Sequence, residues 1–171
     1  MVCNVFLLHA QIKLDSLDSL IKLNETLVID TVIRIDSLQN LIEDPEILSA
    51  ALLHDTIEDT DTSAHELEKI FGSRVRIIVE ELTDNNLLTF SQRKQMQIDN
   101  APYLSKDATL VNIADKTSNV SDVIKNPPPE WNQKRCTEYV DRAEAVINNC
   151  QKVNQDLENY FFELLTEYRK L

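Results

Sequence analysis

Glycine is nearly absent from this sequence, whose 171 residues contain only one, Gly72. Tight hairpins, β-bulges and loops that cradle phosphate usually need glycine, because they hold the backbone at positive φ. This scarcity argues against a sheet-rich fold and against a glycine-rich nucleotide loop. Leu and Glu are abundant instead, and such side chains lose little rotamer freedom in a helix. We therefore predict an all-α fold.

Long apolar runs are also missing, and cysteines are few. No run approaches the ~20 apolar residues of a membrane span, and the apolar stretch 2–8 lacks the basic flank of a signal peptide. The three cysteines show no metal-binding spacing. Cys136 and Cys150 fall in one predicted helix, which separates them by ~21 Å, too far for a disulfide. We therefore predict reduced thiols, a cytoplasmic location and no membrane partner.

Basic residues are outnumbered, because 17 Lys and Arg stand against 29 Asp and Glu and give a formal net charge of −12. Proteins that coat nucleic acid neutralise phosphates with clustered cations. No such cluster is present, so no nucleic-acid partner is predicted. A small anionic substrate is still compatible with this charge if a metal ion and a few local cations offset the repulsion. The sequence makes no prediction about oligomeric state.

Capping residues, the glycine and a run of prolines divide the chain into helices. Asp44 before Pro45, Ser63 with Glu66, and Ser105 are typical helix starts. Gly72 is a typical helix end, and proline ends a helix at 127–129. The predicted helices cover about 14–41, 46–57, 64–71, 73–82, 91–100, 106–125, 131–149 and 151–170. A chain of this length forms one domain in most proteins, so we predict a single domain over residues 1–171.

An apolar helical segment, 50–53, is followed at once by a histidine and carboxylates: His54, Asp55, Glu58 and Asp59. Burying such charges costs several kcal/mol unless they are paired or bind a cation. An imidazole with a carboxylate is a mixed N/O ligand set that suits Mn, Fe or Zn. Glu58 and Asp59 lie three and four residues beyond Asp55, beside the same helical face. They are placed to handle a water molecule.

A second polar group directly follows the largely apolar segment 108–114. Asp115 and Asn119 lie four residues apart there, on one helical face. If this helix packs against the segment that carries His54 and Asp55, Asp115 can join them around one metal ion. Asn119 would then lie further from the metal.

These motifs occur in a recognisable order: His-Asp, then Glu-Asp, then a distant Ala-Asp-Lys with Asn four residues after the aspartate. The series resembles the hydrolase domain of the RelA/SpoT group within the HD superfamily, an all-α helical bundle. Within that group, the series resembles the small stand-alone alarmone hydrolases, which include the metazoan SpoT homologue. The likeness runs from about Asp44 to Leu171, whereas residues 1–43 diverge. It includes residues 50–62, Phe71-Gly72, 80–84, Arg93-Lys94, Ala101-Pro102, 113–119, Trp131, Arg135 and Glu138-Tyr139.

The resemblance implies a site and a reaction. It implies one Mn²⁺ ion on His54, Asp55 and Asp115, and activation of the attacking water by Glu58 and Asp59. The residues that it places at the nucleotide substrate are Asn119, Arg135, Tyr139 and Lys94. The implied substrate is (p)ppGpp, the guanosine tetraphosphate or pentaphosphate of the stringent response. The implied reaction releases its 3′-diphosphate as pyrophosphate. A metal ion supports such hydrolysis by activating water and neutralising phosphoryl oxygens.

One ligand of the family pattern is missing. The family has a fourth ligand, a histidine, in a segment that corresponds here to 27–35, and Asp30 or Thr31 stands in its place. The basic element that precedes this histidine in the family is also absent. Asp30 could supply an oxygen ligand, or the site could be weakened. The alternatives are therefore an NADPH or other nucleotide phosphatase of the same fold, or an impaired binding module.

Several candidates also have a purely structural interpretation. His54 could be a hydrogen-bonded core histidine, and Asp115 could form a surface ion pair with Lys116. Lys94 is interpreted first as a surface charge, with contact to phosphate as the alternative. Trp131 is predicted to be a packing anchor rather than a ring that stacks on a base.

Overall fold

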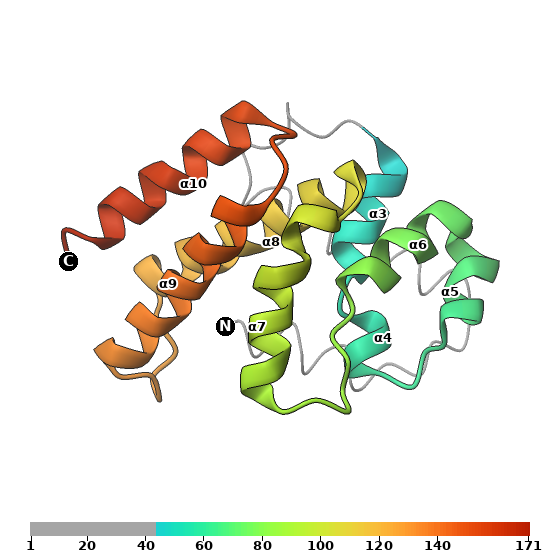
Figure 1. Cartoon of the computed structure of the whole chain (residues 1–171), viewed down its shortest axis with the longest axis horizontal. Helices are drawn as coiled ribbons and strands as arrows, with labels where there is room; N and C mark the ends of the chain where they lie inside the picture. The colour runs from blue at the N-terminus through green and yellow to red at the C-terminus, as the bar shows by residue number, and fades with distance from the viewer. Residues whose placement is uncertain (1–43) are drawn as a thin grey trace. The chain divides into compact units, whose positions relative to one another are not determined.

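The computed structural model describes residues 44–171, and in this range every regular element is a helix, which confirms the all-α prediction (Figure 1). The predicted helix at 14–41 and the stretch 27–35 lie outside the described residues. The described residues form two compact units, 44–83 and 84–171, called here the N-terminal part and the C-terminal part. Each part has its own buried apolar side chains.

The N-terminal part is built around one helix. Its helices are α3 (Pro45–Leu53), α4 (Thr56–Asp59), α5 (Ala64–Phe71) and α6 (Ser73–Leu82). α6 packs against the other three. The buried apolar side chains come from α3, α5 and α6: Ile47, Ala50, Leu67, Val75, Ile78 and Val79. The apolar stripe of α6 therefore supplies half of this core, as its helical spacing requires.

Local caps begin and end these helices as predicted. The Asp44 side chain accepts from the backbone N–H of Glu46 at 3.0 Å, and the Arg74 guanidinium beside it lowers the pKa of that carboxyl. Ser63 and Glu66 form the reciprocal capping box. Gly72 ends α5 at φ 89, a conformation that favours glycine.

The predicted continuous helix over 46–57 is wrong, because α3 ends at Leu53 and the short α4 starts at Thr56. In a continuous helix the Ala51 carbonyl would accept from the N–H of Asp55. Here the His54 ring lies 2.8 Å from that carbonyl. A side chain that competes for a backbone acceptor favours a turn over further helix, so His54 and Asp55 lie at the junction of two helices.

The C-terminal part contains α7 (Phe90–Asn100), the 3₁₀ turn η1 (Ala101–Tyr103), α8 (Lys106–Lys125), α9 (Gln133–Asn149) and α10 (Gln155–Tyr168). α8 packs against both α9 and α10, and α9 also packs against α7. Apolar side chains at helical spacing meet there, among them Val111, Val120, Val140, Leu157 and Phe161, all at most 1% exposed. α8 and α9 are thus the helices on which the polar residues described below are held.

Side-chain caps set the first residue of each of these helices. Ser105 caps α8, whose predicted range is confirmed. Three other starts differ from the prediction by one to four residues, because the caps at Thr89, Asn132 and Asn154 were not recognised from the sequence. No helix in residues 44–171 is long and apolar enough to cross a membrane.

Cys136 and Cys150 are buried free thiols, which confirms that they do not form a disulfide with each other. Burial raises the pKa of the Cys150 thiol to about 11. The thiol is therefore neutral at physiological pH, as expected for a structural rather than a reactive cysteine.

Candidate functional site

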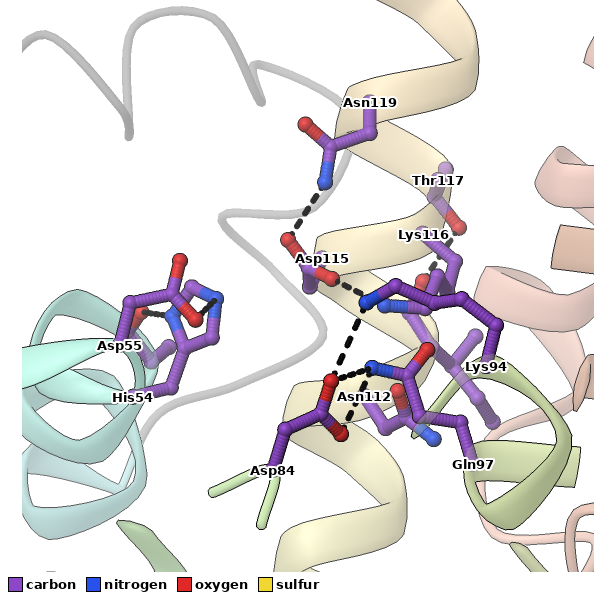
Figure 2. Close-up of polar contacts among 12 residues, drawn as sticks. His54, Asp55, Asp84, Lys94, Gln97, Asn112, Asp115, Lys116, Thr117 and Asn119 are labelled. Carbon is purple, nitrogen blue, oxygen red and sulfur yellow. Dashed lines mark hydrogen bonds and ion pairs between the residues drawn. The ribbon is translucent and has the colours of Figure 1, made fainter. Parts of the chain in front are cut away.

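His54 and Asp55 form a close pair at the junction of α3 and α4 in the N-terminal part (Figure 2). The His54 Nδ1 lies 2.8 Å from the Ala51 carbonyl oxygen, which can only accept, so Nδ1 carries the proton and donates. The Nε2 of the same ring lies 3.2 Å from Oδ1 of Asp55. The side chains are 23% and 45% exposed, so the pair is accessible to solvent.

This arrangement suits metal binding. In a neutral imidazole whose Nδ1 donates to a carbonyl, the lone pair is on Nε2, and metal-ligating histidines are commonly oriented in this way. A lone-pair nitrogen beside a carboxylate oxygen needs a cation between or near them, either a proton or a metal ion. His54 is therefore not a buried core histidine, and its chemistry with Asp55 fits the predicted N/O ligand set.

Glu58 and Asp59 follow on α4. The backbone N–H of Asp59 donates to the carbonyl of Asp55 at 2.9 Å, which preserves helical spacing between the two aspartates despite the break. Glu58 is half-buried and Asp59 is exposed. The sequence argument that these carboxylates follow Asp55 by one helical turn therefore agrees with the local geometry.

Asp115 lies on α8 in the C-terminal part, between two side chains of the same helix (Figure 2). Its Oδ2 is 2.7 Å from Nζ of Lys116, and its Oδ1 accepts from Nδ2 of Asn119 at 2.6 Å. The side chains of the ion pair are only 18% and 16% exposed, so this is not the surface pair that the structural interpretation assumed. The predicted shared face of Asp115 and Asn119 is confirmed by their hydrogen bond.

Lys94 is held by Asp84 and is not a free surface charge. Its Nζ lies 3.2 Å from Oδ2 of Asp84, and Nε2 of Gln97 donates to both Asp84 oxygens at 3.0 Å (Figure 2). The Asp84 side chain is only 7% exposed, against 29% for Lys94. The interpretation of Lys94 as a surface charge is therefore wrong, because a nearly buried carboxylate fixes its direction.

Within the C-terminal part, α7, α8 and α9 and the segment before α9 surround a pocket of about 650 Å³. Its lining residues are Phe90, Lys94, Gln97, Lys116, Trp131, Asn132, Lys134, Arg135, Glu138, Tyr139, Arg142, Ala143 and Val146. Five are cations and one is an anion, in a chain that is acidic as a whole. Such a concentration of positive charge in a concave site attracts an anionic ligand.

Three of the four candidate substrate residues line this pocket: Lys94, Arg135 and Tyr139. The fourth, Asn119, is not among the lining residues and contacts Asp115 instead. Trp131 lines the pocket and packs on Tyr139, with ring centroids 5.4 Å apart. It therefore contributes to both packing and the pocket wall.

Sequence reasoning missed several of the polar residues in the C-terminal part. Asp84, Gln97 and Lys116 were not proposed, although Lys116 directly follows Asp115. Arg142 was missed as well, although it lies seven residues after Arg135 and therefore on nearly the same face of a helix. That spacing is the one signal in the sequence that pointed to it.

Neither part, as described, brings three His, Cys, Asp or Glu side chains together in a group that could hold a metal ion. His54 and Asp55 are two candidate ligands in the N-terminal part, and Asp115 is a third candidate in the C-terminal part. The donor chemistry of each is compatible with a divalent transition metal.

The HD domain family model matches residues 15–142. The chain belongs to the HD-domain family. Hydrolases of this family depend on a metal ion. The match spans three quarters of the sequence and contains the His54-Asp55 pair and Asp115.

Individual relatives are similar over most of the chain. Guanosine-3′,5′-bis(diphosphate) 3′-pyrophosphohydrolase MESH1 of Mus musculus is 44% identical over 126 residues, which is 74% of this chain and 70% of the relative. MESH1 of Drosophila melanogaster is 38% identical over 135 residues, or 79% and 74% of the two chains. A solved structure of a metazoan ortholog of SpoT that hydrolyses ppGpp has a TM-score of 0.75 and 38% identity. It covers 84% of this chain and 83% of its own.

Proposed function

We propose that this protein hydrolyses guanosine 3′,5′-bis(diphosphate) and its pentaphosphate analogue, releasing the 3′-diphosphate as pyrophosphate. The observation that carries the proposal is the cationic, aromatic pocket of the C-terminal part in a chain of net charge −12. A nucleotide with several phosphates and a flat base matches such a lining. The MESH1 relatives bear the name of this activity.

His54, Asp55 and Asp115 are proposed to hold one Mn²⁺ ion. His54 is already oriented for this role, because its Nδ1 donates to the Ala51 carbonyl. Asp115 would exchange its ion pair with Lys116 for the metal, while Asn119 keeps hold of the other carboxylate oxygen. The bound ion would supply charge neutralisation at the phosphoryl oxygens and activation of water.

Glu58 and Asp59 are proposed to accept the proton of the attacking water. The water oxygen forms a bond to the phosphorus next to the ribose 3′ oxygen, and the bond between that phosphorus and O3′ breaks. One water proton passes to a carboxylate of α4, and that protonated carboxyl group returns the proton to O3′ as it leaves. A positioned carboxylate contributes roughly 100-fold or more to such a step.

Lys94, Arg135 and Tyr139 are proposed to contact the nucleotide from the pocket wall. Lys94 is aimed by Asp84, so its amino group does not need to be ordered when the ligand binds. A preorganised cation lowers the entropic cost of binding. The proposed substrate is thus a small nucleotide, and the proposed site of action is the cytoplasm.

The test is pyrophosphate release from guanosine 3′,5′-bis(diphosphate) by the purified full chain, with and without added Mn²⁺. Asp115→Ala should abolish turnover and leave the helical circular dichroism unchanged, because it removes a ligand at a partly exposed position. Asp122→Ala on the same helix is the matched control and should retain activity. Turnover by Asp115→Ala would contradict the assignment of that residue.

The same assay separates the alternative functions. Free phosphate from NADPH would indicate an NADPH phosphatase, and free phosphate from nucleoside monophosphates would indicate a general nucleotidase. A folded protein that binds the nucleotide but releases nothing at any Mn²⁺ concentration would be a binding module.

A further inference from the structure

The pocket contains two guanidinium groups that no carboxylate of the described residues, 44–171, neutralises. Lys94, Lys116 and Lys134 are each paired with a carboxylate, at 3.2, 2.7 and 3.7 Å respectively. Arg135 and Arg142 have no carboxylate partner among residues 44–171. Arg142 is half-buried, and removing an uncompensated charge from water costs free energy. An anionic ligand is the natural compensation.

The neighbouring carboxylates are engaged elsewhere. Glu138, the one acidic residue of the pocket lining, pairs with Lys134 on the preceding turn. Asp141, next to Arg142 in the sequence, pairs with Arg169 of α10. Neither removes the positive charge that Arg142 adds to the pocket.

Each of the two guanidinium groups lies on an aromatic ring. Arg135 lies over Trp131 at 4.8 Å from the ring centroid, and Arg142 lies over Phe90 at 5.7 Å. The Lys94 ammonium also lies 5.7 Å from the Phe90 ring. A ring beneath a guanidinium fixes its plane and leaves its N–H donors for a ligand. Phe90 is 56% exposed and begins α7, so it has little packing role of its own.

The two arginines are seven residues apart on α9, two helical turns, which corresponds to about 10 Å along the axis. Two anchors at that separation suit a ligand whose anionic groups lie on opposite sides of a sugar. A single phosphate chain would reach one of them.

We propose that Arg142, positioned by Phe90, is a second anion-binding point of the pocket, so that Arg135 and Arg142 each bind a different diphosphate group of one nucleotide. This inference rests on the proposed function for the identity of the ligand. It adds a selection rule: the pocket prefers a nucleotide with phosphoryl groups at both the 3′ and 5′ positions over one with a single phosphate chain.

The experiment compares Arg135→Gln and Arg142→Gln with two nucleotides in the Mn²⁺ assay. For guanosine 3′,5′-bis(diphosphate), each variant should raise KM by about tenfold, which corresponds to ~1.4 kcal/mol. GDP, which carries one diphosphate, is used as a competitive inhibitor. The inhibition constant of GDP should rise in only one of the two variants. Lys170→Gln removes an exposed cation of the same part outside the pocket, and both constants should stay within about twofold of the parent.

Two results would overturn the inference. If Arg142→Gln changes neither constant, the group is a solvated cation on an aromatic ring. If GDP binding weakens in both variants, the two arginines act on one anion. Should the parent protein release no pyrophosphate, the proposed function fails, and calorimetric dissociation constants of the same nucleotides decide the inference by the same pattern.

Phe90→Leu tests the positioning role without removing a charge. It should raise KM for the bis(diphosphate) about threefold, in line with the strength of an exposed cation–π contact, and Phe90→Tyr should restore the parent value. If Phe90→Leu has no effect while Arg142→Gln does, Arg142 acts without the ring.

Discussion

At the scale of single residues, the direction of the Lys94 side chain depends on one nearly buried carboxylate. Asp84 precedes α7, and its oxygens accept from both Lys94 and Gln97 of that helix. The lysine therefore reaches the pocket in a defined orientation. Its role cannot be understood from its own position alone.

Asp84→Asn should raise KM for the bis(diphosphate) about fivefold with little change in kcat. The reason is that the charge that aims Lys94 is lost, and such a pair contributes up to ~1 kcal/mol. Steady-state kinetics at constant ionic strength measures the effect. Asp99→Asn, which changes an exposed carboxylate on the same helix, is the control. A fall in kcat with unchanged KM would instead assign Asp84 to the chemical step.

At the scale of elements, α8 matters most, because it carries Asp115 and packs against α9 and α10. Its start is set by Ser105, whose Oγ accepts from the N–H of Ala108 at 3.2 Å. Its end is set by Asn126 before the prolines. The helix therefore holds Asp115, Lys116 and Asn119 in fixed register.

Ser105→Ala should lower the free energy of unfolding by about 1 kcal/mol, because the loss of the serine hydroxyl leaves an N–H of the first turn without its acceptor. Urea unfolding followed by circular dichroism measures the loss. Ser105→Asn should recover most of it, since asparagine is also a good cap. Equal stability of the alanine variant and the parent would show that the cap contributes nothing.

At the scale of the whole molecule, the charge of the pocket is opposite in sign to the net charge of the chain. The chain is acidic, yet five cations gather around one pocket of the C-terminal part. The proposed metal ligands come from both parts of the chain.

Added Mn²⁺ should raise the melting temperature of the full chain. At about 100 times its dissociation constant, a single ion contributes ~2.7 kcal/mol, or roughly 5–10 °C for a protein of this size. His54→Ala and Asp115→Ala, although in different parts, should each remove the shift, and Asp122→Ala should keep it. Differential scanning calorimetry provides the measurement. A full shift in either ligand variant would contradict a shared ion.

Features that depend on neighbours along the chain were predictable from the sequence. The capping box of Ser63, the end of α5 at Gly72 and the whole range of α8 were predicted correctly, because caps act over three or four residues. The break after Leu53 was not. It depends on a hydrogen bond of the His54 ring that competes with the backbone.

Composition was enough to predict the all-α class, because the scarcity of glycine is a property of the chain itself. The order of the motifs, with the His-Asp pair and Asp115, was enough to indicate an HD-domain hydrolase. Tertiary structure decided which cations are neutralised and which face the pocket. Asp84 and Lys94 are ten residues apart, and Phe90 meets Arg142 across two helices. The first contact depends on how the loop before α7 folds back onto that helix, and the second depends on how α7 packs against α9. Residue order carries no direct signal of either, because many side chains share the same helical face.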